Sequence, residues 1–388
     1  MKSRIIKKAY IMFFLLSYIF YNTEVSIPQF MQTTFTVICL LLFLVWGTFE
    51  RKYRIKELFV YGLTLSIGLA SYAITGMSVF LLILLSIIMI DYDDLKETVR
   101  IAFILRVIGL LVLLFLCLFD VTSITKGEVY KSGIYITTYT MGFNHSNQLG
   151  QVLGIIIIMF IILYNKKIKG LANLFIFCSI IVAYRICGSR TMLGCTMLFF
   201  LLTVFMKSNK RRKSLCNIIS RYRWLIMTFI LFIAVVCPVL MTKLSEKPLM
   251  MLYALNAILG SRFSFASAVI NNYDLNLFGN VFDFSYLSHL YGTYAVDNGY
   301  INILYNFGII AFACFVIFSM NAVKNLIQNE YEIYGIFIII VCVWGLMENI
   351  LFVPSVNIPV LFIGVGIKEH VHKRLENGDE NINCVDRI

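Results

Sequence analysis

Charged side chains are scarce in this chain. Asp, Glu, Lys and Arg make up 14% of its 388 residues, and 60% of the residues are hydrophobic. Soluble domains contain about 25% charged and about 45–50% apolar residues. This imbalance excludes a soluble multidomain enzyme as the class of protein.

The sequence also lacks the patterns of nucleotide and metal sites. It has no Walker pattern and no glycine-rich phosphate loop, so we expect no use of ATP or of a sugar nucleotide. Its ten cysteines stand singly without CxxC spacing, as small apolar residues among packed helices do. The four histidines, His145, His289, His370 and His372, are too dispersed for a metal cage. We therefore expect no metal and no other cofactor.

What the sequence does contain is a series of apolar runs of about 16–22 residues, a length that crosses a bilayer as a helix. They predict an all-α polytopic membrane protein, a single integral membrane domain over residues 1–388, with about twelve transmembrane helices. The first run follows a basic start and has no small-x-small cleavage site, so it should remain as a span. The expected spans are 9–22, 30–49, 58–75, 77–91, 100–119, 147–164, 170–186, 191–206, 224–241, 299–320, 332–352 and 355–367.

Basic residues set the expected orientation. The net charge is +12, and most Lys and Arg residues fall in alternate connections, which predicts that both termini and the tail 368–388 are cytoplasmic. The basicity is thus a topology signal, and no nucleic acid is needed to explain it. The two longest connections, 120–143 and 242–298, then lie outside, with 242–298 as one large extracytoplasmic loop. Long loops on a rigid scaffold often carry function.

Two charged features on the cytoplasmic half have ordinary explanations. Asp91-Tyr92-Asp93-Asp94 is similar to the metal-binding DxD of nucleotide-sugar transferases, but a solvated turn that caps the next helix is favoured. Arg106 lies within the fifth expected span. Its side chain either reaches the interface or packs inside the bundle, with a functional site as the alternative.

Three arginines fall on the expected outer side, against the usual charge bias. Arg185 and Arg190 flank the turn before the eighth span, and Arg262 lies in the large loop. A guanidinium matches phosphate oxygens with paired hydrogen bonds. A diphosphate at the membrane surface would account for all three, and a lipid headgroup or a salt bridge to Asp or Glu is the alternative.

Polar groups precede the sixth and tenth spans. His145 and Asn147 open the sixth span, where exposed N–H groups favour anions, although a simple capping turn explains them too. Asp297 opens the tenth span and is either a helix cap or a general base, with His289 as the rival base. Glu348 lies near the outer end of the eleventh span, an expensive place for a carboxylate, and we expect it to face the same cavity.

Taken in order, three segments resemble a known family. Residues 142–150, GFNHSNQLG, resemble the G-x-x-H-x-N-x-x-G pattern of Wzy-type polysaccharide repeat-unit polymerases. Residues 188–191, GSRT, resemble their S-R-T element, and residues 297–310 resemble their D-N-x-Y-(I/L)…G-(I/L)-(I/L) helix. The related O-antigen ligases carry a His before Asn at position 297, where this chain has Asp. The resemblance implies a GT-C-like membrane glycosyltransferase fold.

The resemblance also implies a reaction in a bacterial cytoplasmic (inner) membrane. A glycan on undecaprenyl diphosphate is the donor, and a hydroxyl of a second lipid-linked repeat unit attacks its anomeric carbon. Undecaprenyl diphosphate leaves, and a flippase and a chain-length regulator act beside the enzyme. On this scheme the catalytic residues are Asp297, Arg190 and Arg262. The candidate substrate contacts are Arg185, His145, Asn147, His289, Asn298, Tyr300 and Glu348.

Two other functions stay open. A ligase-type enzyme would transfer a finished glycan once instead of building a ladder of repeats. A transporter or flippase of lipid-linked oligosaccharides would carry charged residues deep in several spans and short loops on both sides, whereas only Arg106 and Glu348 are candidates for such positions here.

Overall fold

A computed structural model of the chain describes residues 2–25, 27–49, 55–131, 134–243, 250–258, 261–283, 286–287, 289, 296–366 and 368. Most of these residues are helical. Within the described part, five helices are long and apolar enough to cross a bilayer, and four shorter apolar helices accompany them. The expected class, a helical membrane protein, is confirmed at this level.

The first half of the chain forms helices α1 (Lys2–Leu16), α2 (Gln29–Phe49), α3 (Ile55–Thr75), α4 (Ser78–Met89), α5 (Leu95–Leu118), α6 (Ser146–Tyr164) and α7 (Leu171–Cys187). The second half forms α8 (Arg190–Phe205), α9 (Asn209–Leu231), α10 (Cys237–Lys243), α11 (Met250–Ile258), α12 (Arg262–Asn272), α14 (Gly299–Asn302), α15 (Gly308–Gln328) and α16 (Glu332–Trp344). One π-helical turn, Phe232–Val236, joins α9 to α10, and another, Ile303–Phe307, joins α14 to α15.

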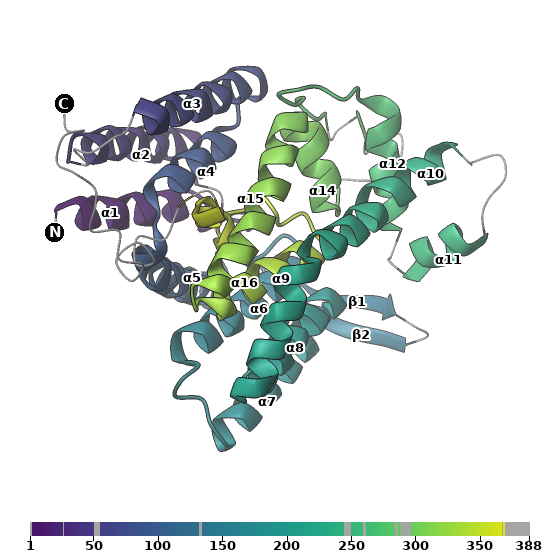
Figure 1. Ribbon diagram of the computed structural model, residues 1–388. Coiled ribbons are helices and arrows are strands. Elements are labelled where there is room, and N and C mark those ends of the chain that lie inside the picture. Colours follow the sequence, from purple (N-terminus) through teal and green to yellow (C-terminus); the bar gives the residue numbers. More distant parts are fainter. Residues whose placement is uncertain are drawn as a thin grey trace.

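Helices α15 and α16 lie at the centre of the molecule, with α9 and α8 beside them (Figure 1). Helix α4 is buried along almost its whole length, while α2 exposes large apolar side chains such as Leu41 and Leu44. Water would penalise such an exposed apolar face, so it is the surface that lipid would cover.

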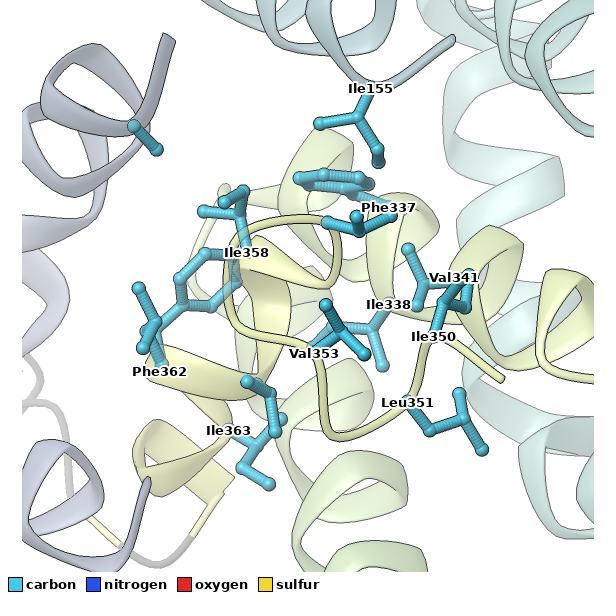
Figure 2. Packing of buried hydrophobic residues seen from close by; sticks show 14 of the residues in the cluster. Ile155, Phe337, Ile338, Val341, Ile350, Leu351, Val353, Ile358, Phe362 and Ile363 are labelled. Carbon is cyan, nitrogen blue, oxygen red and sulfur yellow. The ribbon is translucent and has the colours of Figure 1, made fainter. Parts of the chain in front are cut away.

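The chain after α16 packs into the core instead of forming another long helix. Ile350, Val353 and Phe362 lie among Phe337 and Ile338 of α16 (Figure 2). The expected spans at 332–352 and 355–367 are therefore corrected. The α-helix of the first ends at Trp344, and the second consists of two short 3₁₀ turns, Ile358–Leu361 and Ile363–Gly366.

Asn357 explains why no continuous helix forms there. Its side-chain oxygen accepts a hydrogen bond from the backbone N–H of Val360 at 3.2 Å, which starts the first 3₁₀ turn. Its amide nitrogen donates to the carbonyl of Leu351 at 2.6 Å. Pro359 lies in this first turn and has no N–H to continue a helix from the preceding chain.

Arg106 of α5 has a packing role. Its guanidinium is buried, donates to the backbone carbonyl of Ile19 at 2.9 Å and also donates to the carbonyl of Ser355. The side chain thus joins the end of the first apolar segment to the C-terminal segment. This agrees with the packing alternative for Arg106.

The connection 120–143, expected as a loop, contains a β-hairpin. Strands β1 (Lys126–Lys131) and β2 (Ile134–Tyr139) pair antiparallel, with Lys126 opposite Tyr139. The hairpin projects from the helical body (Figure 1). It is the departure from an all-α fold in the described part of the chain.

Part of the expected large loop docks on the π-helical turn before α15. The backbone N–H of Asn280 donates to the carbonyl of Tyr305 at 3.0 Å, and the N–H of Ile309 donates to the carbonyl of Asn276 at 3.0 Å. Gly308 makes this possible, because its φ of 92° suits glycine and a Cβ there would lie 2.4 Å from the carbonyl oxygen of Leu277. The segment 274–280 is therefore fixed to the tenth-span helix.

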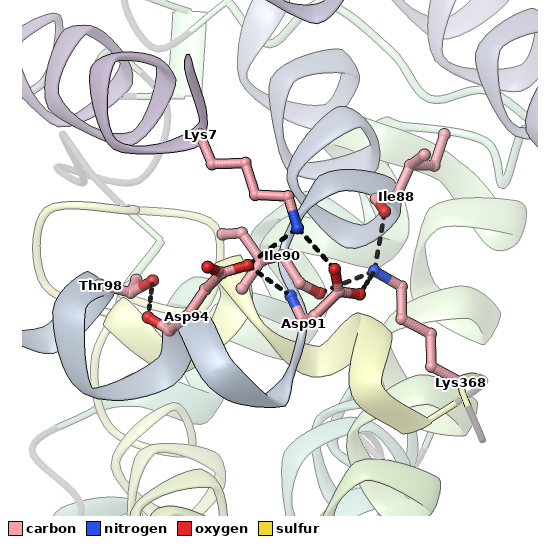
Figure 3. A network of polar contacts seen from close by, with 7 residues as sticks. All are labelled: Lys7, Ile88, Ile90, Asp91, Asp94, Thr98 and Lys368. Atoms are coloured by element: carbon pink, nitrogen blue, oxygen red, sulfur yellow. Dashed lines mark hydrogen bonds and ion pairs between the residues drawn. The ribbon is translucent and has the colours of Figure 1, made fainter. Parts of the chain in front are cut away.

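The DxD-like turn lies in an ion-pair network (Figure 3). Lys7 contacts Asp91 at 2.5 Å and Asp94 at 3.0 Å, and Lys368 contacts Asp91 at 2.7 Å. Asp94 also accepts from the N–H of Asp91, which caps the turn. Burial alone would raise the pKa of Asp91, but the two ammonium groups outweigh it and lower that pKa. The expected structural role of this acidic turn is thus supported, but ion pairs hold its carboxylates, and Asp94 is buried instead of solvated.

Candidate functional site

Glu348 is the centre of the candidate site. It lies in the turn after α16 and is 2% exposed. Its Oε1 accepts from Thr191 Oγ1 at 2.8 Å and pairs with Arg262 Nη2 at 3.1 Å. Its Oε2 accepts from Gln151 Nε2 at 3.1 Å. These four residues form what we call the Glu348 cluster.

Two helices begin at this cluster, and a third passes it near its own start. Arg262 is the first residue of α12, Thr191 is the second residue of α8, and Gln151 lies in the second turn of α6. The N-terminal end of a helix carries unpaired N–H groups and a partial positive charge. A buried carboxylate is therefore placed where helix ends, a guanidinium and neutral donors all stabilise its charge.

Gly150 allows α6 to come this close. A Cβ at position 150 would lie 2.8 Å from Ser189 Cβ and 2.9 Å from Cys187 Sγ, in the turn between α7 and α8. Both distances are shorter than van der Waals contact, so a larger residue would push the helices apart. Glycine at 150 thus lets its neighbour Gln151 share a carboxylate with Thr191.

The three residues of the S-R-T element have different environments and contacts. Ser189 caps α8, because its side chain accepts from the backbone N–H of Met192 at 3.4 Å. Thr191 reaches Glu348. Arg190, the residue between them, is exposed.

Arg262 is fixed by its neighbours on both sides. Its Nε donates to the carbonyl of Met347 in addition to the pair with Glu348. The side-chain oxygen of Asn256, in α11, accepts from the backbone N–H of Phe263 at 2.9 Å. Its backbone carbonyl accepts from the N–H of Ser261 at 2.9 Å. Asn256 therefore takes the place of a conventional N-cap for α12 and sets where Arg262 starts.

Asp297 lies close enough to interact electrostatically with the charges of this site. Burial raises the pKa of the Asp297 carboxyl above its ordinary value, and Arg262 and His145 oppose that rise without cancelling it. Its charge also acts on Glu348. The site thus holds two carboxylates and an arginine, the groups that proton transfer and anion binding require.

His145 caps α6. Its ring Nδ1 accepts from the backbone N–H of Asn147 at 3.1 Å. The backbone N–H of His145 donates to Gln148 Oε1 at 3.1 Å. Because Nδ1 is an acceptor here, the neutral imidazole carries its proton on Nε2. The exposed ring therefore combines the capping role with a position near Asp297, and Asn147 follows it half-buried.

Asn298 and Tyr300 hold the start of α14. Asn298 Oδ1 accepts from the N–H groups of Tyr300 and Ile301, both at 3.1 Å, and its Nδ2 donates to Ala234 O at 2.7 Å. The Tyr300 hydroxyl donates to Cys342 O at 2.9 Å, and both side chains are buried. These contacts fix the start of α14, the helix that directly follows Asp297 and Asn298.

The structure brings some of the expected residues together and leaves others apart. Arg262, Glu348, Asp297 and His145 share one region. Arg190 is one residue from Thr191 of the cluster. Arg185 and His289 are exposed, and within the described ranges no hydrogen bond or ion pair joins either of them to the Glu348 cluster.

Sequence reasoning missed Gln151 and Asn256. Gln151 lies four residues beyond Asn147, one helical turn further on the same face, so it is a polar side chain inside an apolar helix. That spacing was an available signal. Asn256 gave no such signal, because its role depends on the fold of residues 250–264.

No family model, curated protein or solved structure matches the chain. Among the residues that the structure describes, no three His, Cys, Asp or Glu side chains gather as a metal site would require.

Proposed function

We propose that this protein polymerises undecaprenyl-diphosphate-linked oligosaccharide repeat units into a surface polysaccharide. The observation that carries the proposal is a convergence in space. The segments 142–150, 188–191 and 297–310, which together resemble the Wzy-type polymerases, border one site around the buried Arg262–Glu348 pair. If these segments served only to cap their own helices, they would not need to lie at one common site.

The proposal includes an orientation. Both termini and the Lys7 network face the cytoplasm, the Glu348 cluster faces away from it, and the membrane is the bacterial cytoplasmic membrane. The five long and four shorter apolar helices, together with α1, α3 and the buried segment 345–366, would make up about twelve crossings. Residues 242–298 form the large extracytoplasmic loop, and α11 and α12 belong to it.

The chemistry follows from the charges. The oxygen of the acceptor hydroxyl forms a bond to the donor's anomeric carbon, the bond from that carbon to the diphosphate oxygen breaks, and the hydroxyl proton passes to Asp297. Arg262, with Arg190, stabilises the negative charge on the leaving diphosphate. A guanidinium has five N–H donors, so Arg262 can keep Glu348 as an orienting partner while it binds phosphate.

The remaining expected residues take positioning roles in this proposal. His145 and Asn147 contact a sugar beside Asp297, and Arg185 and His289 contact substrate from the exposed rim. A flippase supplies the lipid-linked units and a chain-length regulator acts on the product.

Deletion of the gene tests the class of activity. We expect the polysaccharide ladder to disappear and single lipid-linked repeat units to accumulate on the outer face of the membrane. Repeat units trapped on the cytoplasmic face would instead identify a flippase. Full-length polymer retained on the lipid carrier would identify a ligase, and either result would refute the polymerase.

A further inference from the structure

A cavity of about 500 Å³ is lined by residues that follow Glu348 and Asp297 in the chain. The end of the first apolar segment, the α3–α4 turn, the helix that follows Asp297, and residues 349–353 form its walls. Its volume falls within the range of about 300–1,000 Å³ that is usual for small-ligand sites.

The lining is mixed polar and apolar and carries no charge. It combines carboxamides and tyrosines with three hydroxyl residues and with apolar side chains such as Phe20, Phe307 and Phe352. The carboxamides and tyrosines are Asn22, Gln32, Asn302, Asn306, Asn349, Tyr18 and Tyr21. Neutral donors and acceptors beside aromatic rings suit a hydroxyl-rich neutral ligand, whereas a phosphate would be desolvated without a cation to pair with.

Asn306 supplies the most specific signal. The residue is 9% exposed, and its Oδ1 has no hydrogen-bond partner in the described part of the chain. Its Nδ2 faces Met77 Sδ at 3.7 Å, a weak acceptor. A buried carbonyl oxygen without a donor costs about 1–3 kcal/mol. A rotation of the side chain that turns this oxygen toward the cavity would let an O–H group of a ligand supply the missing donor.

The cavity continues the candidate site. Asn349 directly follows Glu348, and Asn302 and Asn306 follow Asp297 on one helix. Asn302 is the last residue of α14 and Asn306 lies in the π-helical turn that follows, five and nine residues after Asp297. The opposite wall is also tied to the site, because the N–H of Asn144, the residue before His145, donates to the carbonyl of Asn22 at 3.1 Å.

We propose that this cavity binds the neutral, non-reducing end of the acceptor glycan. Asn302 and Asn306 contact its hydroxyls at the buried end, Tyr21 and Gln32 contact it at the exposed rim, and the attacking hydroxyl points toward Asp297. The assignment to the acceptor rests on the proposed polymerase function. The binding of a neutral sugar rests on the cavity itself.

The test uses the oligosaccharide that mild acid releases from the cell's own lipid-linked repeat units. Its dissociation constant is measured by saturation-transfer NMR on full-length protein in lipid nanodiscs. We expect Asn306→Ala and Asn349→Ala each to weaken binding at least tenfold. Asn306→Ala should fold, because the side-chain oxygen has no partner to lose. Gln29→Ala, an exposed change in α2 outside the cavity, should bind like the wild type.

The outcomes separate the two proposals. Absence of oligosaccharide binding by the wild type, as when lipid tails fill the cavity, would overturn the pocket assignment, and so would equal binding by the two pocket variants. Arg262→Lys should bind the free oligosaccharide normally while it polymerises poorly. If the wild type binds the sugar through Asn306 and Asn349 but forms no polymer, the polymerase proposal fails and the sugar site stands.

Discussion

Arg262 and Glu348, 86 residues apart in the chain, form a nearly buried ion pair at 3.1 Å. The side chain of Glu348 is 3% exposed and that of Arg262 is 15% exposed. Neither charge is well hydrated, so each depends on the other. Glu348 also depends on the neutral donors Thr191 and Gln151, and Arg262 on the carbonyl of Met347. This pair couples the start of α12 to the turn after α16.

Removal of one partner should therefore destabilise the protein more than removal of both. Arg262→Met leaves Glu348 buried without its counter-charge, at a cost of about 3–5 kcal/mol. The double variant Arg262→Met/Glu348→Met should recover most of that loss, because no uncompensated charge remains. Thermal unfolding in detergent measures both changes. Additive losses in the double variant would show that the pair is not coupled.

The same variants separate stability from activity. The double variant should remain without polymer even where its stability recovers, because Arg262 is needed for the leaving diphosphate. Loss of one such donor lowers turnover by about 10²–10³-fold in other enzymes. A folded double variant that makes polymer of normal length would contradict this role.

Asp297→Asn should lower turnover and leave the protein equally stable or more stable at neutral pH. The native pKa of Asp297 is raised, so the native state holds its proton to higher pH than the unfolded chain does. Its contribution to stability is present at low pH and is lost as the pH rises through that native pKa. Asparagine removes this loss and also removes the base.

The measurement for Asp297 is a pair of pH profiles. Wild-type turnover should fall on the acid side at a pH above the ordinary aspartate pKa, and the variant should lack that acid limb. A variant that is less stable than the wild type at neutral pH, with unchanged turnover, would leave Asp297 with a structural role alone. That role would not be the helix cap, because Asn298 caps α14.

Gly308→Ala should destabilise the protein by at least about 2 kcal/mol, since φ of 92° with ψ of 171° is a region that only glycine adopts easily. The added Cβ would also meet the carbonyl of Leu277. Gly62→Ala is the matched control, because it lies inside α3 with nothing within 4 Å of its Cβ. It should leave the unfolding free energy unchanged or raise it by up to about 1 kcal/mol. Equal effects at both positions would contradict the docking of segment 274–280.

Lys7→Met should cost roughly 2 kcal/mol, because Asp94 loses its ammonium partner and Asp91 keeps only Lys368. Lys8→Met removes a more exposed pair with Glu97 and should cost less than about 1 kcal/mol. Asp91 has a lowered pKa, so its contribution is present above its unfolded pKa and is lost as the pH falls through the native one. Thermal unfolding as a function of pH should therefore show the Lys7 difference shrinking below about pH 4. A difference that stays constant into acid would exclude the network as its source.

The sequence predicted the long helices well where apolar runs were unbroken. The expected span 147–164 differs from α6 by one residue, and 30–49 differs from α2 by one. The prediction of a helical span was wrong after Trp344. The residues there are as apolar as a span, but Asn357 and Pro359 start a short 3₁₀ turn instead of a long helix. Periodicity cannot separate a buried irregular segment from a helix. The hairpin at 126–139 was missed because its strands are short and lie in a polar connection.

The candidate site was predicted in part. His145, Asp297 and Glu348 were singled out as polar residues at the ends of apolar runs, and Arg262 as an arginine in the expected outer loop. The structure places the four in one region. Gln151 and Asn256 act only through contacts with residues more than 150 positions away or with a separate helix start. Such contacts depend on the tertiary fold, which local pattern does not report.

The most direct test of the central claim reconstitutes the purified protein in liposomes that hold lipid-linked repeat units and no nucleotide. We expect a ladder of products, with one undecaprenyl diphosphate released for each new glycosidic bond, and no ladder with Arg262→Ala. Absence of both release and bond formation by the wild type, or an unchanged ladder with Arg262→Ala, would contradict it.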